Sequence, residues 1–230
     1  MGYDTCIAKE NPMNRVEAGR IAKKTGHEKE AWACEYLEEQ FGGEYEVDGG
    51  NRTKVDILRT DKDVSFSLKS VSGKNTQCHL TTVTKWMEYF NIEGDLRQWF
   101  HKFFGIPGMD VSWGSSKQHR CKASEIDSHL NDMALSWFND NRMSIFDVIV
   151  RSGMNNTPVD YVIWHHKVKN TTEIIDVNKL AEMVYNGEWV LNDTTLAFVS
   201  GGKKLFHLQM KGSGKRYSAG YHGLMFHIHN

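Results

Sequence analysis

The stretch Lys54-Val-Asp-Ile-Leu-Arg-Thr-Asp-Lys-Asp-Val-Ser-Phe-Ser-Leu-Lys-Ser70 predicts a β-hairpin around which the rest of the chain is organised. In its first half, Asp56 stands between two apolar residues, and a polar turn follows over residues 60–63. The second half alternates between apolar and polar residues, which places Ser67 and Lys69 on one face of a strand. The pattern therefore predicts two antiparallel strands with an embedded carboxylate.

Pairing of these two strands would bring Asp56 close to Ser67 and Lys69 at one strand end. Carboxylate and other oxygen atoms are the ligands that Mg²⁺ prefers. A bound divalent cation polarises a phosphoryl oxygen and lowers the pKa of its water. A neighbouring lysine can orient that water and offset the charge of the transition state. The grouping therefore favours Mg²⁺-dependent cleavage of phosphodiester bonds.

Asp56, followed after ten residues by Ser67-Leu-Lys69, resembles the core motif of the PD-(D/E)XK nuclease superfamily. That superfamily includes many restriction enzymes, some homing endonucleases and repair nucleases. The resemblance covers roughly residues 26–80, about a quarter of the chain. Val55 stands where the motif has proline, and Ser67 stands where it usually has a second acid. Ser67 therefore supplies no charge to a metal.

The resemblance implies a role for each residue of the motif. Asp56 would bind Mg²⁺, or Mn²⁺ as its substitute, with help from the backbone carbonyl of Leu68. Lys69 would position the attacking water, and Ser67 would hold a water bound to the metal. These roles imply a hydrolase that cuts DNA.

An amphipathic helix is predicted over residues 26–42, where apolar residues recur at helical spacing and two glycines end the run. In the resembled superfamily, a helix before the first core strand often carries an acid that faces the metal. Glu28 fits this catalytic, metal-binding position best, and Glu30 is the second choice. The alternative is that both are solvated acids, favoured by the positive end of the helix dipole.

The composition sets limits on the class of protein. A chain of 230 residues predicts one large domain. The net charge of −1 excludes a global nucleic-acid-binding signature, so any such binding must come from a local patch. Four scattered cysteines without metal-ligand spacing favour a reducing, cytoplasmic location. No apolar run is long enough to span a membrane.

A block of helices is predicted over about residues 82–150, as an insertion or lobe within the single domain. The helices expected there cover residues 82–90, 94–104, about 124–139, and a segment that begins at Asn141 or Ser144. Their aromatic residues are more typical of a core than of a base-stacking platform. Strands follow near residues 160–166 and 173–177. The whole pattern predicts an α/β fold with a central mixed β-sheet flanked by helices, of restriction-endonuclease-like type.

The segment from Ser200 to the C-terminus, predicted as a basic hairpin over about residues 200–230, contains no Asp or Glu. Arginine can donate two hydrogen bonds to a phosphate or a guanine, and lysine supplies positive charge. We therefore expect this segment to bind double-stranded DNA, although a solvated basic tail is the alternative. Its candidate DNA-binding residues are Lys203, Lys204, Lys211, Lys215, Arg216 and Tyr217.

A polar loop is predicted over residues 70–80, directly after the lysine of the motif. Backbone N–H groups of such a loop can hold phosphates. Lys74 and Gln77 are its candidate DNA-binding residues. The alternative is a polar loop with no contact to a ligand.

The C-terminal hairpin also offers a competing site. Gln209-Met-Lys211 resembles the variant motif that some superfamily members use, and Asp193 is its best upstream acid. We prefer the site at Asp56 and Lys69, because Asp193 lies in a polar loop. His165 and His166 are adjacent, so in a strand their side chains would face opposite ways and could not easily share an ion.

The function predicted from these observations is a metal-dependent, site-specific DNA endonuclease of restriction or homing type. Such enzymes often act as homodimers on palindromic sites. One alternative is a non-catalytic DNA-binding protein on a degenerate nuclease scaffold, which Ser67 in place of an acid would allow. Another is an RNA-processing nuclease.

Overall fold

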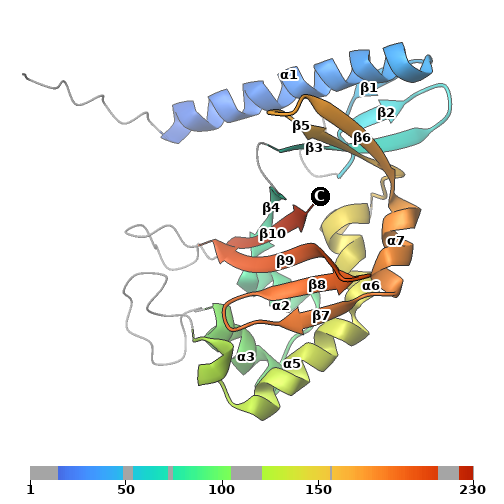
Figure 1. The fold of residues 1–230 in the computed structure, drawn as a ribbon. Coiled ribbons are helices and arrows are strands. Elements are labelled where there is room, and N and C mark those ends of the chain that lie inside the picture. Colours follow the sequence, from blue (N-terminus) through green and yellow to red (C-terminus); the bar gives the residue numbers. More distant parts are fainter. Residues whose placement is uncertain are drawn as a thin grey trace, which may run out of the picture.

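A computed structural model gives the fold as two five-stranded β-sheets accompanied by helices (Figure 1). The described residues are 15–48, 54–71, 75–104, 121–155, 157–211 and 223–229. Side chains are not described at 15–23, 71–81, 155, 209–211 and 223–229 within these ranges. The predicted α/β class, with a mixed sheet flanked by helices, is confirmed, but the single sheet expected from the sequence is in fact two.

The first sheet carries the motif strand at its centre. Its strands, in spatial order, are β1 (Tyr45–Val47), β2 (Ile57–Arg59), β3 (Val64–Val71), β5 (Tyr161–His166) and β6 (Thr171–Asp176). Strands β3 and β5 are parallel and all other neighbours are antiparallel, so the sheet is mixed. The predicted hairpin is therefore present as β2 and β3, connected by a turn over residues 60–63.

The second sheet is antiparallel throughout. Its strands, in spatial order, are β4 (Asn75–Thr82), β10 (Gly223–His229), β9 (Lys203–Lys211), β8 (Leu196–Ser200) and β7 (Glu188–Leu191). The loop expected over residues 70–80 was wrong, because most of it forms β4. This strand pairs along its whole length with β10, the last strand of the chain. Backbone pairing with so distant a segment gives a polar sequence a strand conformation that its composition does not indicate.

The helices between β4 and β5 lie where they were predicted. They are α2 (Val83–Tyr89), α3 (Gly94–Phe104), α5 (Ser128–Asp140) and α6 (Arg142–Phe146), with short 3₁₀ helices at Ala123–Glu125 and Gly153–Asn155 and a π-helix at Asp147–Arg151. Helix α7 (Val177–Tyr185) follows β6. Side-chain oxygens cap several of these helices: Asp127 accepts from the His129 N–H of α5 at 2.8 Å, and Asp176 accepts from the Asn178 N–H of α7 at 2.8 Å.

The aromatic stripe of the helical block is core, as its pattern predicted. Trp99, Phe100, Phe103 and Phe104 of α3 are completely buried. The rings of Trp99 and Phe103 stack with 4.6 Å between their centroids. The Trp99 indole N–H donates to Asn131 Oδ1 at 2.9 Å. The hydrogen bond to this acceptor offsets the cost of removing the indole N–H from water. These aromatic side chains therefore hold α3 against α5 and are not available to nucleic-acid bases.

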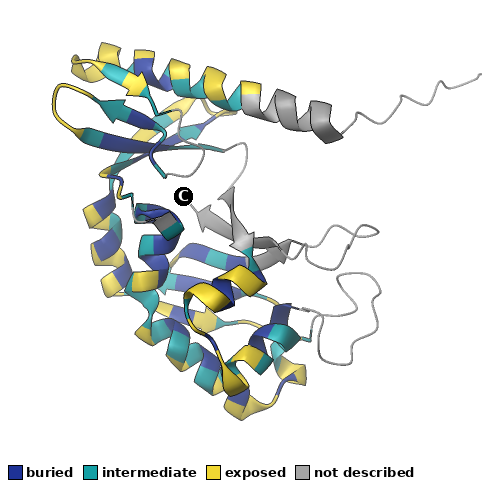
Figure 2. Cartoon of the chain, turned by 180° about the vertical axis from the view of Figure 1, so that it is seen from behind, coloured by how far each residue is buried: buried dark blue, intermediate teal, exposed yellow. Residues whose placement is uncertain are grey.

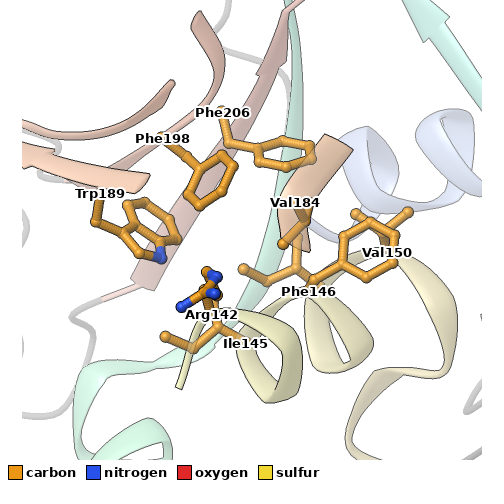
Figure 3. Close-up of a pocket in the computed structure, with 9 residues that line it drawn as sticks. Arg142, Ile145, Phe146, Val150, Val184, Trp189, Phe198 and Phe206 are labelled. Carbon is orange, nitrogen blue, oxygen red and sulfur yellow. The ribbon is translucent and has the colours of Figure 1, made fainter. Parts of the chain in front are cut away.

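The second sheet packs against α6 through a dry apolar layer (Figure 3). Trp189, Phe198 and Phe206 project from the sheet toward Ile145 and Phe146 of the helix. The space between these side chains does not admit a water molecule. Close packing of this kind fixes the helix on the sheet.

The long helix α1 (Arg15–Phe41) lies across one face of the first sheet (Figure 1). Its inner residues are buried, whereas its outer side is exposed (Figure 2). The contact is apolar and consists of Ala33, Cys34 and Leu37 from α1 with Ile57, Phe66 and Ile163 from the sheet. Because strand residues alternate between faces, Ser67 and Lys69 point to the opposite face. None of the helices in the described ranges has the length and hydropathy needed to cross a membrane.

Truncation of a buried α1 side chain should destabilise the protein. Leu37 is completely buried against the first sheet, so Leu37→Ala should lower the free energy of unfolding by about 2–5 kcal/mol. Glu39→Ala, an exposed position on the same helix, should change it by less than about 0.5 kcal/mol. Urea unfolding followed by circular dichroism measures both. Equal stability of the two variants would contradict the packing of α1 described above.

The Cys34 thiol should be unreactive in the folded protein. Burial raises its pKa to about 11, and the nearby carboxylates of Glu38, Glu30 and Glu35 add to the shift. At pH 8, below this pKa, the group is almost entirely the neutral thiol, whereas the thiolate is the nucleophile. Iodoacetamide should therefore alkylate Cys34 more slowly than the half-buried Cys121, as measured by peptide mass spectrometry. Alkylation of Cys34 at equal rates with and without urea would contradict this expectation.

Candidate active site

Two strands hold the backbone of Asp56, which directly precedes β2. Its N–H donates to the Phe66 carbonyl at 2.8 Å, and its carbonyl accepts from the Asp48 N–H at 3.1 Å. Its neighbours Val55 and Ile57 are buried. The apolar flanks that marked this aspartate in the sequence therefore anchor the backbone, and the carboxylate lies where β2 begins.

The Asp56 carboxylate takes the place of a missing backbone acceptor. Strand β2 pairs with β3 only as far as Phe66. The Leu68 N–H, at the same edge of β3, therefore has no β2 carbonyl to which it can donate a hydrogen bond. That N–H donates to Asp56 Oδ2 at 2.6 Å. The Ser67 hydroxyl donates to the same oxygen at 3.0 Å. A carboxylate held by two donors is fixed in position, which is what a binding or catalytic group requires.

Lys69 completes the cluster from the next position on the same face of β3. Its ammonium donates to Ser67 Oγ at 2.5 Å and to the Leu68 carbonyl at 3.3 Å, and it lies 3.5 Å from Asp56 Oδ2. Ser67 is completely buried, whereas the Lys69 and Asp56 side chains are 18% and 28% exposed. The structure thus brings together Asp56, Ser67 and Lys69, with both charged groups within reach of a ligand.

The oxygen atoms of the cluster suit a hard divalent cation. All the described contacts of the Asp56 carboxylate use Oδ2, so Oδ1 has no partner within the described ranges. The Leu68 carbonyl accepts a long hydrogen bond from the Lys69 ammonium, at 3.3 Å. Mg²⁺ is typically bound by one or two carboxylates, with waters and substrate phosphates completing its shell. Asp56 and the Leu68 carbonyl fit such a partial site. The described ranges hold no group of three or more metal-ligating side chains.

The structure does not bring Glu28 to this cluster. Glu28 lies on α1, which covers the Phe66 face of the sheet, whereas Lys69 projects from the other face. The Glu28 carboxylate lies 3.9 Å from the Lys24 ammonium and lines a different cleft. Glu30, the second choice, lies 3.0 Å from the His27 ring. The order of helix and strand in the sequence indicates that they pack together, but it does not tell which face of the strand the helix covers.

The candidate DNA-binding residues are distributed over several places. Lys203 and Lys204 are exposed at the start of β9, and Lys211 lies at its other end, roughly 25 Å away for nine strand residues. Gln77 lies on β4. The expected contacts at Lys74, Lys215, Arg216 and Tyr217 fall outside the described residues.

Asp193, the acid of the competing site, is engaged in a structural contact. Its carboxylate accepts from the Ser124 N–H at 3.1 Å and from the Ser124 hydroxyl at 2.7 Å, and it lies 3.9 Å from Lys122. The hydrogen bonds from the Ser124 side chain and backbone hold the pKa of Asp193 below its usual value. The side chains of Gln209 and Lys211 are outside the described set, so this site stays a prediction.

The adjacent histidines of β5 point to opposite faces, as expected for a strand. The His165 ring packs against the Trp32 ring of α1, with 4.4 Å between the ring centroids. His166 is buried, and its ring accepts from the Lys169 N–H at 3.2 Å. The two rings therefore do not share a site.

No protein-family model matches the chain, and no curated protein matches its sequence. Among solved structures, the fold is similar to restriction endonuclease MspI in complex with its cognate DNA. The identity is 12% over 67% of this chain and 69% of that one, with a TM-score of 0.43. It is also similar to HhaI endonuclease in complex with DNA, with 12% identity over 88% of this chain and 90% of that one and a TM-score of 0.37. These are distant similarities of fold, so the proposal below depends on the described residues.

The absent second acid can be restored as a test of the site. Ser67→Asp would place a buried carboxylate beside that of Asp56, and repulsion and desolvation should lower the unfolding free energy by about 1–3 kcal/mol in EDTA. Millimolar Mg²⁺ should recover part of this loss, because a cation that binds only the folded protein stabilises it. Ser67→Asn, which adds no charge, should show no such recovery. Thermal unfolding measures the effect, and equal responses of both variants to Mg²⁺ would contradict a cation site here.

Proposed function

We propose that the chain is a metal-dependent DNA endonuclease of restriction or homing type. The observation that carries the proposal is the convergence of the Asp56 carboxylate, the Ser67 hydroxyl and the Lys69 ammonium, all within 3.5 Å of one another at the end of a β-hairpin. A fixed carboxylate whose second oxygen has no partner among the described residues, next to a positively charged hydrogen-bond donor, is suited to in-line attack of water on a phosphodiester.

Each residue has a distinct role in this proposal. Asp56 Oδ1 and the Leu68 carbonyl would hold Mg²⁺ or Mn²⁺, which supplies positive charge to the scissile phosphate when bound. Lys69 donates hydrogen bonds that orient the attacking water and offset the negative charge that develops on the phosphoryl oxygens. Ser67 is buried and bonded to both charged groups, so it positions them relative to one another.

Serine in place of the second acid has a consequence for metal binding. The charges of Asp56 and Lys69 cancel, so the cluster has no net negative charge to attract a cation. Substrate phosphates commonly supply the remaining ligands of Mg²⁺. We therefore expect the cation to bind weakly to the free protein and more tightly once DNA is present.

Two other functions use the same residues. A non-catalytic DNA-binding protein would keep the scaffold without turnover, and Ser67 in place of an acid is the feature that favours it. An RNA-processing nuclease would need the same cation chemistry on a different substrate. Binding as a homodimer to a palindromic site remains part of the proposal for the DNA endonuclease.

Cleavage of mixed-sequence plasmid and phage DNA with Mg²⁺ or Mn²⁺ tests the proposal. The wild type should give discrete fragments, and EDTA should abolish them. Lys69→Ala should lower the rate by about 100-fold or more, because a charged donor to the transition state is lost. Asp56→Asn, which keeps the shape of the side chain, should do the same. Lys211→Ala tests the competing site and should still give the discrete fragments.

The outcomes separate the candidate functions. Loss of cleavage in Lys211→Ala alone would move the catalytic centre to the C-terminal hairpin. Binding of DNA without cleavage by any form would favour the non-catalytic protein. Cleavage of RNA but not DNA, in parallel reactions, would favour the RNA-processing nuclease.

A further inference from the structure

A second cleft, of about 360 Å³, lies on the α1 face of the first sheet. It is lined by Lys29 and Trp32 of α1, by Ser70 at the end of β3, and by His165 and Lys167 at the end of β5. Strands β3 and β5 belong to the same sheet as the Asp56 cluster, but Ser70 and His165 project from its other face, which α1 covers. The cleft therefore takes no part in the cluster described above.

The cleft holds two lysines that face one another. Contact with the Lys167 ammonium lowers the pKa of Lys29, and burial and charge repulsion add to the shift. Within the described ranges, neither lysine has a carboxylate at ion-pair distance. Glu28 lines the same cleft, but its side chain is 63% exposed, and its carboxylate lies 3.9 Å from the Lys24 ammonium. Two like charges are thus held together without a counter-ion, an arrangement that an anion between them would relieve.

Neutral hydrogen-bonding groups complete the lining. The Ser70 hydroxyl oxygen is buried and has no hydrogen-bond partner among the described residues. The His165 Nδ1 lies 3.1 Å from the Thr172 hydroxyl. When that hydroxyl donates, the other ring nitrogen, Nε2, carries a hydrogen and can donate to a ligand. The cleft therefore combines two cations with hydroxyl and imidazole groups, a set typical of phosphate binding.

We infer that the cleft formed by Lys29, Ser70, His165 and Lys167 binds a phosphate group, which in the proposed DNA endonuclease is a backbone phosphate close to the scissile one. The second half of this inference rests on the proposed function. Ser70 directly follows Lys69 in β3, so the two sites lie on opposite faces of one strand end. A strand of DNA that passes over this end of the sheet would meet both sites within a few nucleotides.

Binding of a fluorescent mixed-sequence duplex in EDTA tests the cleft without cleavage. In the Lys29→Ala/Lys167→Ala double variant, the slope of log affinity against log salt concentration should decrease by about 1, because the contact to one phosphate is lost and each such contact contributes about 0.9. The matched double replacement by arginine, which keeps both charges, should retain the wild-type slope. Lys62→Ala, an exposed lysine in the turn at the other end of β3, should retain it too.

Replacement of Glu28 should change DNA binding in the opposite direction to replacement of the cleft lysines. Removal of its rim charge in Glu28→Gln should strengthen binding of the duplex in EDTA, because a negative group next to the phosphate is lost. Weaker binding in this variant would contradict a phosphate in the cleft.

Inorganic phosphate distinguishes the source of the ligand. The His165 ring resonances of the wild type should shift and saturate on addition of phosphate, and those of the double alanine variant should not. A shift with phosphate but an unchanged salt slope for DNA would leave free phosphate as the ligand and overturn the DNA contact. An unchanged slope together with no shift would overturn the site altogether.

These measurements do not depend on cleavage. When the Lys69→Ala variant also lacks Lys29 and Lys167, its salt slope for duplex binding should decrease as much as it does in the wild type. This holds even if no form of the protein cuts DNA. The double alanine variant loses only repelling charges, so its melting temperature should not fall, which shows that it is folded. If it does not fold, Lys167→Ala alone, on an exposed turn, should still decrease the slope by about 1.

Discussion

The hydrogen bond from the Leu68 N–H to the Asp56 carboxylate is the contact on which the candidate active site depends. It fastens the beginning of β2 to β3 at the point where backbone pairing between them stops. The same oxygen then accepts from Ser67 and lies beside Lys69, so one structural contact also sets the geometry of the charged groups. The same carboxylate therefore serves both the strand junction and the candidate active site.

Strand β3 separates two environments that serve different purposes. Its Phe66 face packs against α1 in an apolar contact, which holds the sheet together. The other face carries Ser67 and Lys69. At the end of the strand, Ser70 returns to the α1 face and lines the cationic cleft. Alternation along a single strand thus places the proposed catalytic cluster and the proposed phosphate site back to back, an arrangement that would suit binding of an extended polyanion.

The proposed nuclease differs from a typical two-acid site in its charge. With Ser67 in place of an acid, the cluster contributes one carboxylate and one ammonium, and the substrate must supply the remaining negative charge. In this proposal, cation binding and DNA binding depend on one another. The lysines of the neighbouring cleft would hold the DNA strand while a phosphate of that strand completes the cation site.

The sequence by itself determined the local features of this protein. The apolar flanks of Asp56 and the alternation up to Lys69 predicted the hairpin, and helical spacing predicted α2, α3 and α5, because these depend on near neighbours in the chain. Only the tertiary structure decided that residues 75–82 form a strand, since β10 supplies the backbone partners. It also decided that Glu28 lies away from Asp56 and beside Lys29, Ser70 and His165. Which face of a strand a helix covers depends on packing between distant segments, and a pattern of near neighbours carries no information about it.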